Sequence, residues 1–428
     1  MPITGQTRTL ARCWWLVALA GCTAPTAGVE TQAISVTDSR TERAIELMGG
    51  FAERTGITSE RPQQRYLWTD SFAVCNFLGL SRATRDERYE RLALRLVDRV
   101  HHVLGRHRSD DPRTGWISGL GEREGEDHPT RGGLRIGKRL AERGPSDPFD
   151  EQLEWDRDGQ YFHYLTKWMH ALDLVARSTR EPRFSRWARE LAERAHAAFT
   201  YVPPGGKRSR MYWKMSIDLS RPLVSSMGHH DPLDGFVTFV QLQTTAEALT
   251  ASPAGPRLDD EIADFASMME GRDWTTADPL GLGGLLMDAY RVQQLMPRGA
   301  FREGELLERL LTAALAGLSH YARQGELRRP ASTRLAFREL GLAIGLRAAE
   351  RMSRVIEEER GGSRASPEVR KRLEALRSHD PIRVEIESFW LEPEHRKAPS
   401  WTEHLDINEV MLATSLVPDG CLVLPSVD

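Results

Sequence analysis

The chain has 428 residues, of which 40% are hydrophobic and 28% are charged, with a formal net charge of −3 at pH 7; this composition is typical of a globular protein and excludes a fibrous or disordered one. We expect no nucleic-acid partner, because such proteins carry a clustered basic excess, and no apolar run approaches the roughly 20 residues of a membrane-spanning helix. Four cysteines are too few for a disulfide scaffold.

The N-terminal segment has the pattern of a bacterial export signal. Arg8 and Arg12 precede a short apolar stretch that ends in Leu-Ala-Gly-Cys at Cys22. This ending resembles the lipobox of bacterial lipoproteins, which implies that Cys22 carries a lipid and becomes the mature N-terminus. A threonine at position 23 resembles the pattern of lipoproteins that are sorted to the outer membrane. A plain signal peptide with an incidental cysteine is the alternative. We therefore expect an exported, lipid-anchored protein with a signal peptide (1–21), a flexible tether (22–38) and a folded domain (39–428).

Cleavage before Cys22 leaves Cys75 and Cys421 as the only thiols besides the anchor. These two can pair in an oxidising compartment, and buried free cysteines are equally common in helical cores. The sequence leaves both states open.

Six segments of the folded part have one apolar and one polar face. In residues 87–104, for example, Tyr89, Leu96 and Val100 recur at helical spacing, while Arg95 and Asp98 lie on the other side. This period predicts helices that cover a core with one face. The six segments are 40–54, 87–104, 184–199, 258–270, 303–321 and 368–377.

Six further segments are apolar nearly all round, as expected of helices buried on every side. They are residues 67–80, 160–176, 236–249, 282–295, 335–349 and 407–416. The two classes alternate along the chain, so we predict an all-α (α/α)6 toroid with six inner and six outer helices. A linear superhelix of helix pairs is the alternative, but it would show a short fixed repeat, and the sequence has none.

Three connections are much longer than the others, at residues 105–159, 201–235 and 378–406. Each leads into a helix of the buried class, so the long loops gather on the face formed by the N-terminal ends of the inner helices. Those ends carry unpaired N–H groups and the positive end of each helix dipole. Long loops in a compact domain are usually functional, so we expect the site on this face.

Carboxylates, histidines and tryptophans are concentrated in these approaches to the inner helices. An aspartate before a helix is often only an N-cap, but capping does not explain paired carboxylates with a tryptophan beside them. Aromatic faces next to acids suit sugar rings. The candidate catalytic residues are Asp70, Asp156, Asp158 and Asp234; the candidate substrate-binding residues are Trp68, Trp155, His163, His229, His230, Asp231, Trp401, His404 and Glu409.

One polar face of a buried segment adds to this pattern. His163, Lys167 and His170 lie at i, i+4 and i+7, and three such groups are costly to bury unless they line a polar bore. The run from His229 to Asp231 has no thiol or HExxH pattern beside it. We therefore expect neither a metal nor a cofactor.

The helical pattern as a whole resembles the six-hairpin glycosidase superfamily. The segment Trp68-Thr69-Asp70-Ser71-Phe72 looks like one of its members, the unsaturated-glucuronyl-hydrolase-like enzymes, and the segment from Trp155 to Gly159 looks like their acidic loop. The resemblance implies a glycoside hydrolase-like enzyme that acts on a glycan or oligosaccharide with two carboxyl groups.

Two other functions stay open at this point. The first is a sugar epimerase in which histidines move the proton, and its candidates are His163, His229, His230 and His404. The second is a non-catalytic accessory lipoprotein that binds a glycan or a protein, since a fold does not by itself fix a function.

Overall fold

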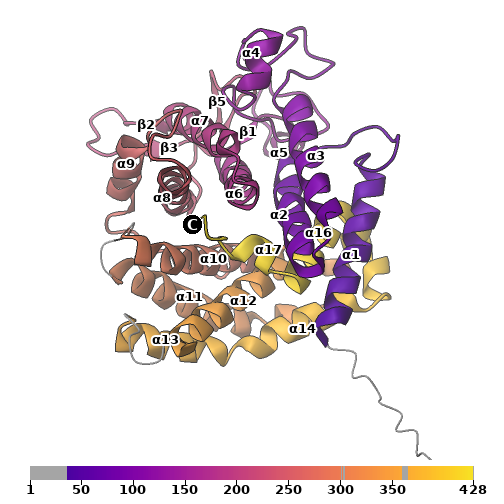
Figure 1. The fold of residues 1–428 in the computed structure, drawn as a ribbon, viewed down its shortest axis with the longest axis vertical. Helices are drawn as coiled ribbons and strands as arrows, with labels where there is room; N and C mark the ends of the chain where they lie inside the picture. Colours follow the sequence, from indigo (N-terminus) through magenta and orange to yellow (C-terminus); the bar gives the residue numbers. More distant parts are fainter. Residues whose placement is uncertain (1–35, 300, 302–303, 359–364, 428) are drawn as a thin grey trace, which may run out of the picture.

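A computed structural model describes residues 36–299, 301, 304–358 and 365–427 of the chain. Its inner helices contact one another in sequence order, and the last also packs on the first, so the ring closes. The inner helices are α2 (Leu67–Thr84), α6 (Phe162–Thr179), α8 (Asp231–Leu249), α10 (Pro279–Leu295), α12 (Ala336–Glu358) and α16 (Leu405–Leu416) (Figure 1). This closure confirms the predicted (α/α)6 toroid and excludes the linear superhelix.

The outer helices pack against the ring from outside. They are α1 (Val36–Arg54), α3 (Glu87–Leu104), α7 (Pro182–Phe199), α9 (Asp259–Met269), α11 (Glu305–Gln324), α13 (Pro367–Arg377) and α14 (Asp380–Leu391). Helix α14 is a correction, because its residues were expected to be loop; Ile386 and Trp390 are buried on the side that packs against α12. Helix α1 begins at Val36, near the end of the segment predicted to be a tether (22–38). The predicted signal peptide (1–21), Cys22 and the rest of that tether lie outside the described residues.

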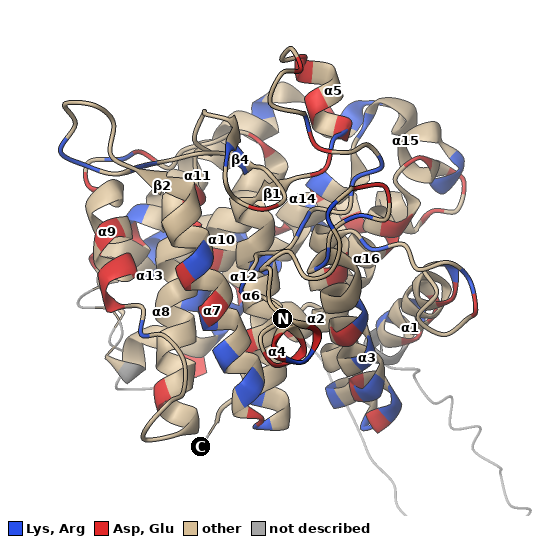
Figure 2. Cartoon of the chain, turned by 90° about the horizontal axis from the view of Figure 1, so that it is seen from above, with Lys and Arg blue, Asp and Glu red and all other residues tan. Residues whose placement is uncertain are grey.

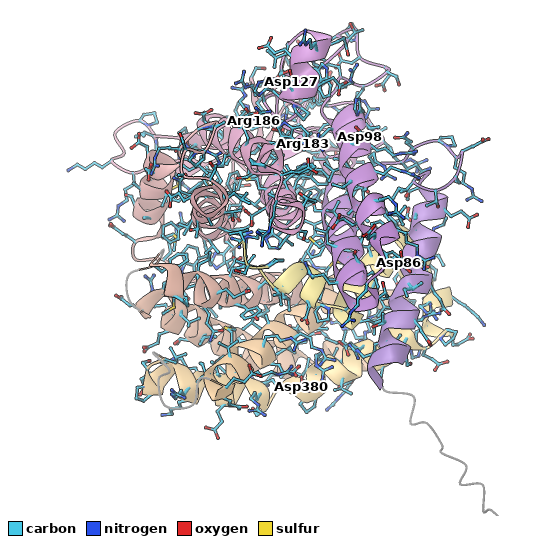
Figure 3. All side chains as sticks on the ribbon, in the orientation of Figure 1. Asp86, Asp98, Asp127, Arg183, Arg186 and Asp380 are labelled. Carbon is cyan, nitrogen blue, oxygen red and sulfur yellow. The ribbon has the colours of Figure 1, made fainter. Side chains whose placement is uncertain are left out.

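The local sequence explains why the two classes of helix take their places. Helix α3 begins at a cap in which the Asp86 carboxylate accepts a hydrogen bond from the Arg88 N–H (2.9 Å). Its Tyr89, Leu96 and Val100 are buried, while Arg95 and Asp98 on its charged face are exposed; charged positions recur along the ribbon of α3 (Figure 2). In α2, by contrast, every residue from 67 to 80 is buried, because this helix is enclosed on all sides. The labelled Asp86 and Asp98 accordingly lie on the periphery of the molecule (Figure 3).

The long loops fold into small elements above the N-terminal ends of the inner helices. Helix α5 (Glu151–Asp156) and a three-stranded antiparallel sheet of order β1-β4-β5 form there, and Gln160 of β1 pairs with Met215 of β4. The strands are β1 (Gln160–Tyr161), β4 (Lys214–Met215) and β5 (Pro222–Val224), beside a hairpin of β2 (Thr200–Tyr201) and β3 (Arg210–Met211). Helix α4 (Glu122–Asp127) lies instead outside the ring, where Trp187 of the outer helix α7 donates to the carbonyl of Asp127 (2.8 Å). The sheet therefore joins the two longest loops to the start of α6.

The C-terminal segment closes the other end of the ring. Helix α17 (Asp419–Leu422) packs on α2 and α10, and the C-terminus lies at the end of the molecule opposite to α5 and β4 (Figure 2). Side chains from the inner helices hold it: Arg177 donates to the carbonyl of Pro425 (3.0 Å) and Gln294 donates to that of Leu422 (2.9 Å). The C-terminal segment thus covers this end of the ring.

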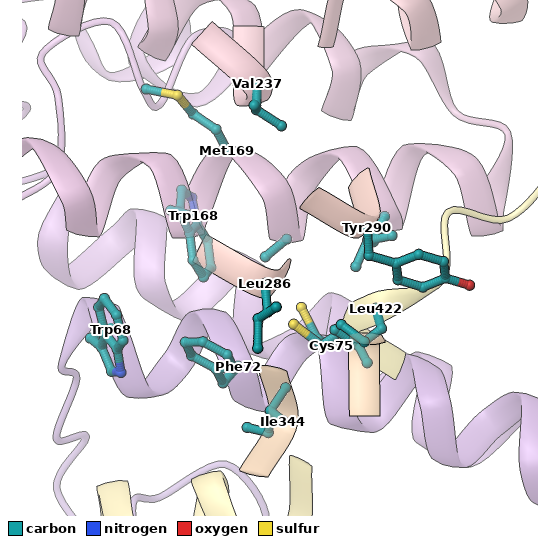
Figure 4. Close-up of a cluster of buried hydrophobic side chains, with 14 of the residues drawn as sticks. Trp68, Phe72, Cys75, Trp168, Met169, Val237, Leu286, Tyr290, Ile344 and Leu422 are labelled. Atoms are coloured by element: carbon teal, nitrogen blue, oxygen red, sulfur yellow. The ribbon is translucent and has the colours of Figure 1, made fainter. Parts of the chain in front are cut away.

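The remaining short elements are η1 (Met296–Arg298), η2 (Glu326–Arg328), η3 (Ala331–Thr333), η4 (His395–Lys397) and α15 (Pro399–Thr402). Apolar side chains fill much of the space between the inner helices, where Phe72, Leu286 and Ile344 form part of one buried cluster (Figure 4). Over the described residues, every helix is too short or too polar to cross a bilayer.

Candidate functional site

The candidate site lies where the N-terminal ends of α6 and α8 meet. Helix α8 begins at Asp231, five residues before its predicted start, so Asp231 and Asp234 occupy its first turn. Pro232 and the two acids favour this earlier start, because proline fits the first turn and negative charge stabilises the N-terminal end of a helix. Asp231 Oδ1 lies 4.0 Å from Nδ1 of His163 on α6.

Asp231 has the properties of a carboxyl that retains its proton near neutral pH. Its side chain is only 7% exposed, and its Oδ2 atom has no hydrogen-bond partner among the described residues. Burial and the nearby charge of Asp234 raise the pKa of Asp231 to about 7. A carboxyl with such a pKa and an unused oxygen is suited to act as a general acid.

Asp234 is the opposite case, a buried carboxylate with several donors. Its Oδ2 accepts a hydrogen bond from Lys167 Nζ (2.8 Å) and another from the Thr166 hydroxyl, and its Oδ1 accepts one from Arg291 Nη2 (2.9 Å). Burial opposes ionisation, but Lys167 and Arg291 outweigh it and hold the pKa of Asp234 below its usual range. Asp234 is therefore charged at neutral pH, and Arg291 also pairs with Asp288 of α10.

His163 stands beside Asp231 as a neutral imidazole. Burial and the charge of Lys167 lower the pKa of His163 to about 4, and its Nδ1 has no hydrogen-bond partner among the described residues. Its ring stacks on Tyr161 (centroids 5.2 Å apart) and on Trp213 (6.0 Å). The nitrogen Nδ1 is buried and faces the Asp231 carboxyl, and an unprotonated ring nitrogen can accept a proton or a hydrogen bond.

Aromatic rings surround His163 and form what we call the aromatic wall, made of Trp68, Tyr161, Tyr164 and Trp213. Trp68 and Tyr164 pack together (5.3 Å), and the Tyr164 hydroxyl is 2.6 Å from that of Tyr66. Trp155 touches the wall through Trp213 (4.9 Å) and is half exposed. Sequence reasoning missed Trp213, Tyr161 and Tyr164; the signal for Trp213 was its place in one of the three long loops.

A cavity of about 20 Å³ lies in the bore of the ring and has room for about one water molecule. Lys167 and His170 line it, as expected from the spacing of His163, Lys167 and His170 on one face, and Asp288 and Arg291 contribute from α10. The bore is therefore narrow and polar where these charged groups meet.

Asp70 and Asp158 are held by arginines and backbone N–H groups. Asp70 accepts from Arg65 (3.2 Å) and from the Tyr66 N–H (3.0 Å), and burial raises its pKa to about 6 against the opposing charge of Arg65. Asp158 accepts from Arg135 (2.9 Å) and also from Arg108 and the N–H groups of Gly137 and Gly159. Because donors already engage their oxygens, these contacts favour structural roles. A catalytic role for either residue stays a prediction.

The other candidates have separate surroundings. Trp401 is buried against Trp390 (5.5 Å), Glu409 pairs with Arg54, and His230 is bonded to the Trp274 carbonyl (2.8 Å), while burial lowers its pKa to about 4. Three are exposed: Asp156, His229 and His404. Of the residues predicted from sequence, the structure brings Trp68, His163, Asp231 and Asp234 together.

No family model and no curated protein matches the sequence. Among solved structures, the chain is similar to a GH76A alpha-1,6-mannanase from Salegentibacter sp. HEL1_6, with a TM-score of 0.48 and 11% identity over 90% of this chain and 99% of that one. It is also similar to a sugar epimerase from a ruminal bacterium (TM-score 0.46, 11% identity, 88% and 98% covered). A third similar structure is cellobiose 2-epimerase from Spirochaeta thermophila DSM 6192, with a TM-score of 0.47 and 10% identity over 90% of this chain and 98% of that one. The assignment of the fold rests on the contacts that close the ring of this chain.

Proposed function

We propose that the chain is a carbohydrate-active enzyme, glycoside hydrolase-like, that acts on a glycan or oligosaccharide with Asp231 as its general acid. The observation that carries the proposal is the position of the buried Asp231 carboxyl, whose Oδ2 atom has no hydrogen-bond partner among the described residues. Its Oδ1 lies 4.0 Å from His163, whose ring stacks on Trp213 of the aromatic wall, and its pKa, raised to about 7, agrees with the role of an acid. Aromatic faces stack on the C–H surface of a sugar ring, while the carboxyl reaches its oxygens.

In this reaction Asp231 donates its proton to the oxygen of the leaving sugar as the glycosidic bond breaks. The positive charge that develops on the other sugar ring is balanced by Asp234, which stays ionised because Lys167 and Arg291 bind it. Water then adds to that ring, and the proton that the water loses returns to the Asp231 carboxylate, so the acid is regenerated. Two carboxyls on one helical turn with opposite protonation states provide the acid and the anion that such a reaction needs.

A second candidate function is epimerisation of a sugar, favoured by the neutral imidazole of His163. In the open-chain form of a sugar, a base removes the proton from the carbon next to the carbonyl, and an acid returns a proton to the other face. His163 serves as the base in this candidate function. Asp231 lies only 4.0 Å from its Nδ1 atom, which is too close for the two groups to flank one carbon, so a different group would return the proton. Hydrolysis shortens the oligosaccharide and creates new reducing ends, whereas epimerisation leaves its length unchanged.

The test is a panel of oligosaccharides incubated with the wild-type chain and with Asp231→Asn, followed by chromatography of the products. New reducing ends that the variant fails to produce support hydrolysis, and an epimer of equal mass supports epimerisation. Binding without turnover in both proteins would contradict catalysis and favour the accessory lipoprotein. Asp98→Asn is the matched control, because Asp98 is exposed on the outer helix α3.

We further infer export and lipid attachment at Cys22, with anchorage in an outer membrane. The support is the sequence Leu-Ala-Gly-Cys after a short apolar stretch and the threonine that follows it. Incorporation of a labelled fatty acid in a bacterial host, lost in Cys22→Ser, tests the lipid, and separation of the membranes tests the location. A wild-type chain without label would contradict the inference.

A further inference from the structure

Two cysteines from opposite ends of the sequence lie side by side at the closed end of the ring. Cys75 is on α2 and Cys421 is on α17, and both are buried. Their sulfurs and a ring nitrogen of His170 all lie within 4.8 Å of one another. Cys75 lies beside Leu422 in the buried cluster (Figure 4), and both residues line the cavity in the bore.

The backbones of α2 and α17 approach closely enough to be bridged. A Cβ atom added to Gly79 would lie 2.7 Å from the Cα atom of Gly420, so the two glycines are in direct backbone contact. A Cβ on Gly420 would lie 2.4 Å from the carbonyl oxygen of Cys75. A disulfide needs Cα atoms within about 7 Å and sulfurs that can meet, and these two glycines permit the approach that places Cys421 next to Cys75.

We propose that Cys75 and Cys421 form a disulfide that fastens the C-terminal segment to the first inner helix and so closes the ring covalently. The proposal rests on the inferred export, since oxidising compartments are where such bonds form and persist. Cys22 is the lipidation candidate, so Cys75 and Cys421 remain as the thiol pair of the mature chain.

The bond forms by exchange with the disulfide of a dithiol oxidant, such as an oxidised thiol–disulfide oxidoreductase. The thiolate of Cys421 attacks one sulfur of the oxidant and releases its partner thiolate; the thiolate of Cys75 then attacks the Cys421 sulfur and releases the second thiolate. The two cysteines lose two protons and two electrons, and the oxidant becomes a dithiol. Because both sulfurs are buried once α17 has docked, exchange takes place while this short helix is undocked.

The surroundings favour a disulfide over a bound metal ion. Both ring nitrogens of His170 are engaged, Nε2 with the Cys421 carbonyl (2.9 Å) and Nδ1 with Gln241 (3.2 Å). The charged groups that line the same cavity are Lys167, Arg291 and Asp288, so positive groups outnumber negative ones and disfavour a cation. A metal site would need His170 to give up one of these hydrogen bonds.

The experiment maps the disulfide in the full chain isolated from an exporting bacterium. After alkylation of free thiols under denaturing conditions, trypsin releases residues 66–82 and 398–428, each with one of the two cysteines. We expect a linked pair of these peptides that is two hydrogens lighter than their sum, absent from Cys75→Ala and from Cys421→Ala. Reduction in denaturant followed by refolding in reductant should lower the Tm by about 5 °C, and the double variant should not respond to reductant.

A second arm separates the disulfide from the export inference. The full chain carrying Cys13→Ser and Cys22→Ser is denatured, reduced and refolded in a glutathione redox buffer. If the linked peptides are found in the refolded chain but not in the chain isolated from the exporting bacterium, the result supports the pairing and contradicts export. If both cysteines are alkylated in both arms, the proposal is overturned. One equivalent of zinc bound to the chain with both thiols free would then assign a metal site in place of the disulfide.

Discussion

Asp231 lies one helical turn before Asp234 on α8, yet the two carboxyls prefer opposite protonation states. Asp234 is bound by Lys167 and Arg291, while the Oδ2 atom of Asp231 has no donor within the described chain. The negative charge of the ionised Asp234 contributes to the raised pKa of Asp231. This asymmetry leads to the first three predictions.

The activity should depend on the protonated form of Asp231. The pKa of this carboxyl is about 7, so the acid is present below pH 7, and kcat/KM should fall as the pH rises through 7. Asp231→Asn should lose activity by about 100-fold or more, the usual contribution of a general acid. A pH–rate profile of the wild type, measured on the substrate found in the oligosaccharide panel, checks this. A flat profile between pH 6 and 8 would contradict the assignment.

The same carboxyl should lower the stability of the protein at alkaline pH. Its pKa is raised from 3.8 to about 7 on folding, so the folded state binds more protons between these values and the free energy of unfolding falls as the pH rises through them. Asp231→Asn removes this penalty, on the order of 4 kcal/mol at pH 8. Urea unfolding should therefore show the variant to be more stable than wild type at pH 8, with little difference at pH 4.

Asp234→Asn should destabilise the fold and shift the pH dependence of activity. Lys167 and Arg291 would lose their buried counter-ion, which typically costs about 3–5 kcal/mol. The loss of a negative neighbour should also lower the pKa of Asp231 and move the fall in kcat/KM to lower pH. Asp98→Asn on the outer surface is the control, expected to change the stability by less than about 0.5 kcal/mol. An unshifted profile in a folded Asp234→Asn variant would show that the two carboxyls are not coupled.

Asp158 should matter for stability and not for the chemical step. Its carboxylate holds Arg108 and Arg135 of the long loop at residues 105–159. In Asp158→Asn the loop should loosen and the midpoint of urea unfolding should fall, while kcat of the folded fraction stays within a few-fold of wild type. A kcat reduced 100-fold in a variant with normal stability would restore the catalytic role that the sequence predicted.

The aromatic wall should contribute to substrate binding. Trp213 is partly exposed and stacks against His163, so a sugar can pack on it. Trp213→Ala should raise KM by about 2- to 10-fold, as expected for the loss of one aromatic contact, and Trp213→Phe should restore most of it. A change in kcat alone, with KM unaltered, would place Trp213 outside the binding surface.

The sequence by itself determined the ring. The distribution of apolar residues within a helix predicts its surroundings: α2 is apolar on all sides and is enclosed, whereas α3 is apolar on one face and is half exposed. Because the two kinds of helix alternate along the chain, few arrangements bury every apolar face. It also predicted that the long loops would gather at the N-terminal ends of the inner helices and that the polar face of α6 would line the bore, where Lys167 and His170 lie.

Only the tertiary structure decided which carboxylates are free to react. Asp158 binds Arg108 and Arg135, which lie 50 and 23 residues before it in the same long loop. Asp231 differs from Asp234 because Arg291 reaches one and not the other from α10. The wall residue Trp213 reaches His163 through the pairing of β1 with β4. Local periodicity carries no information about such partners, because burial and charge at a site arise from segments that meet only when the ring closes.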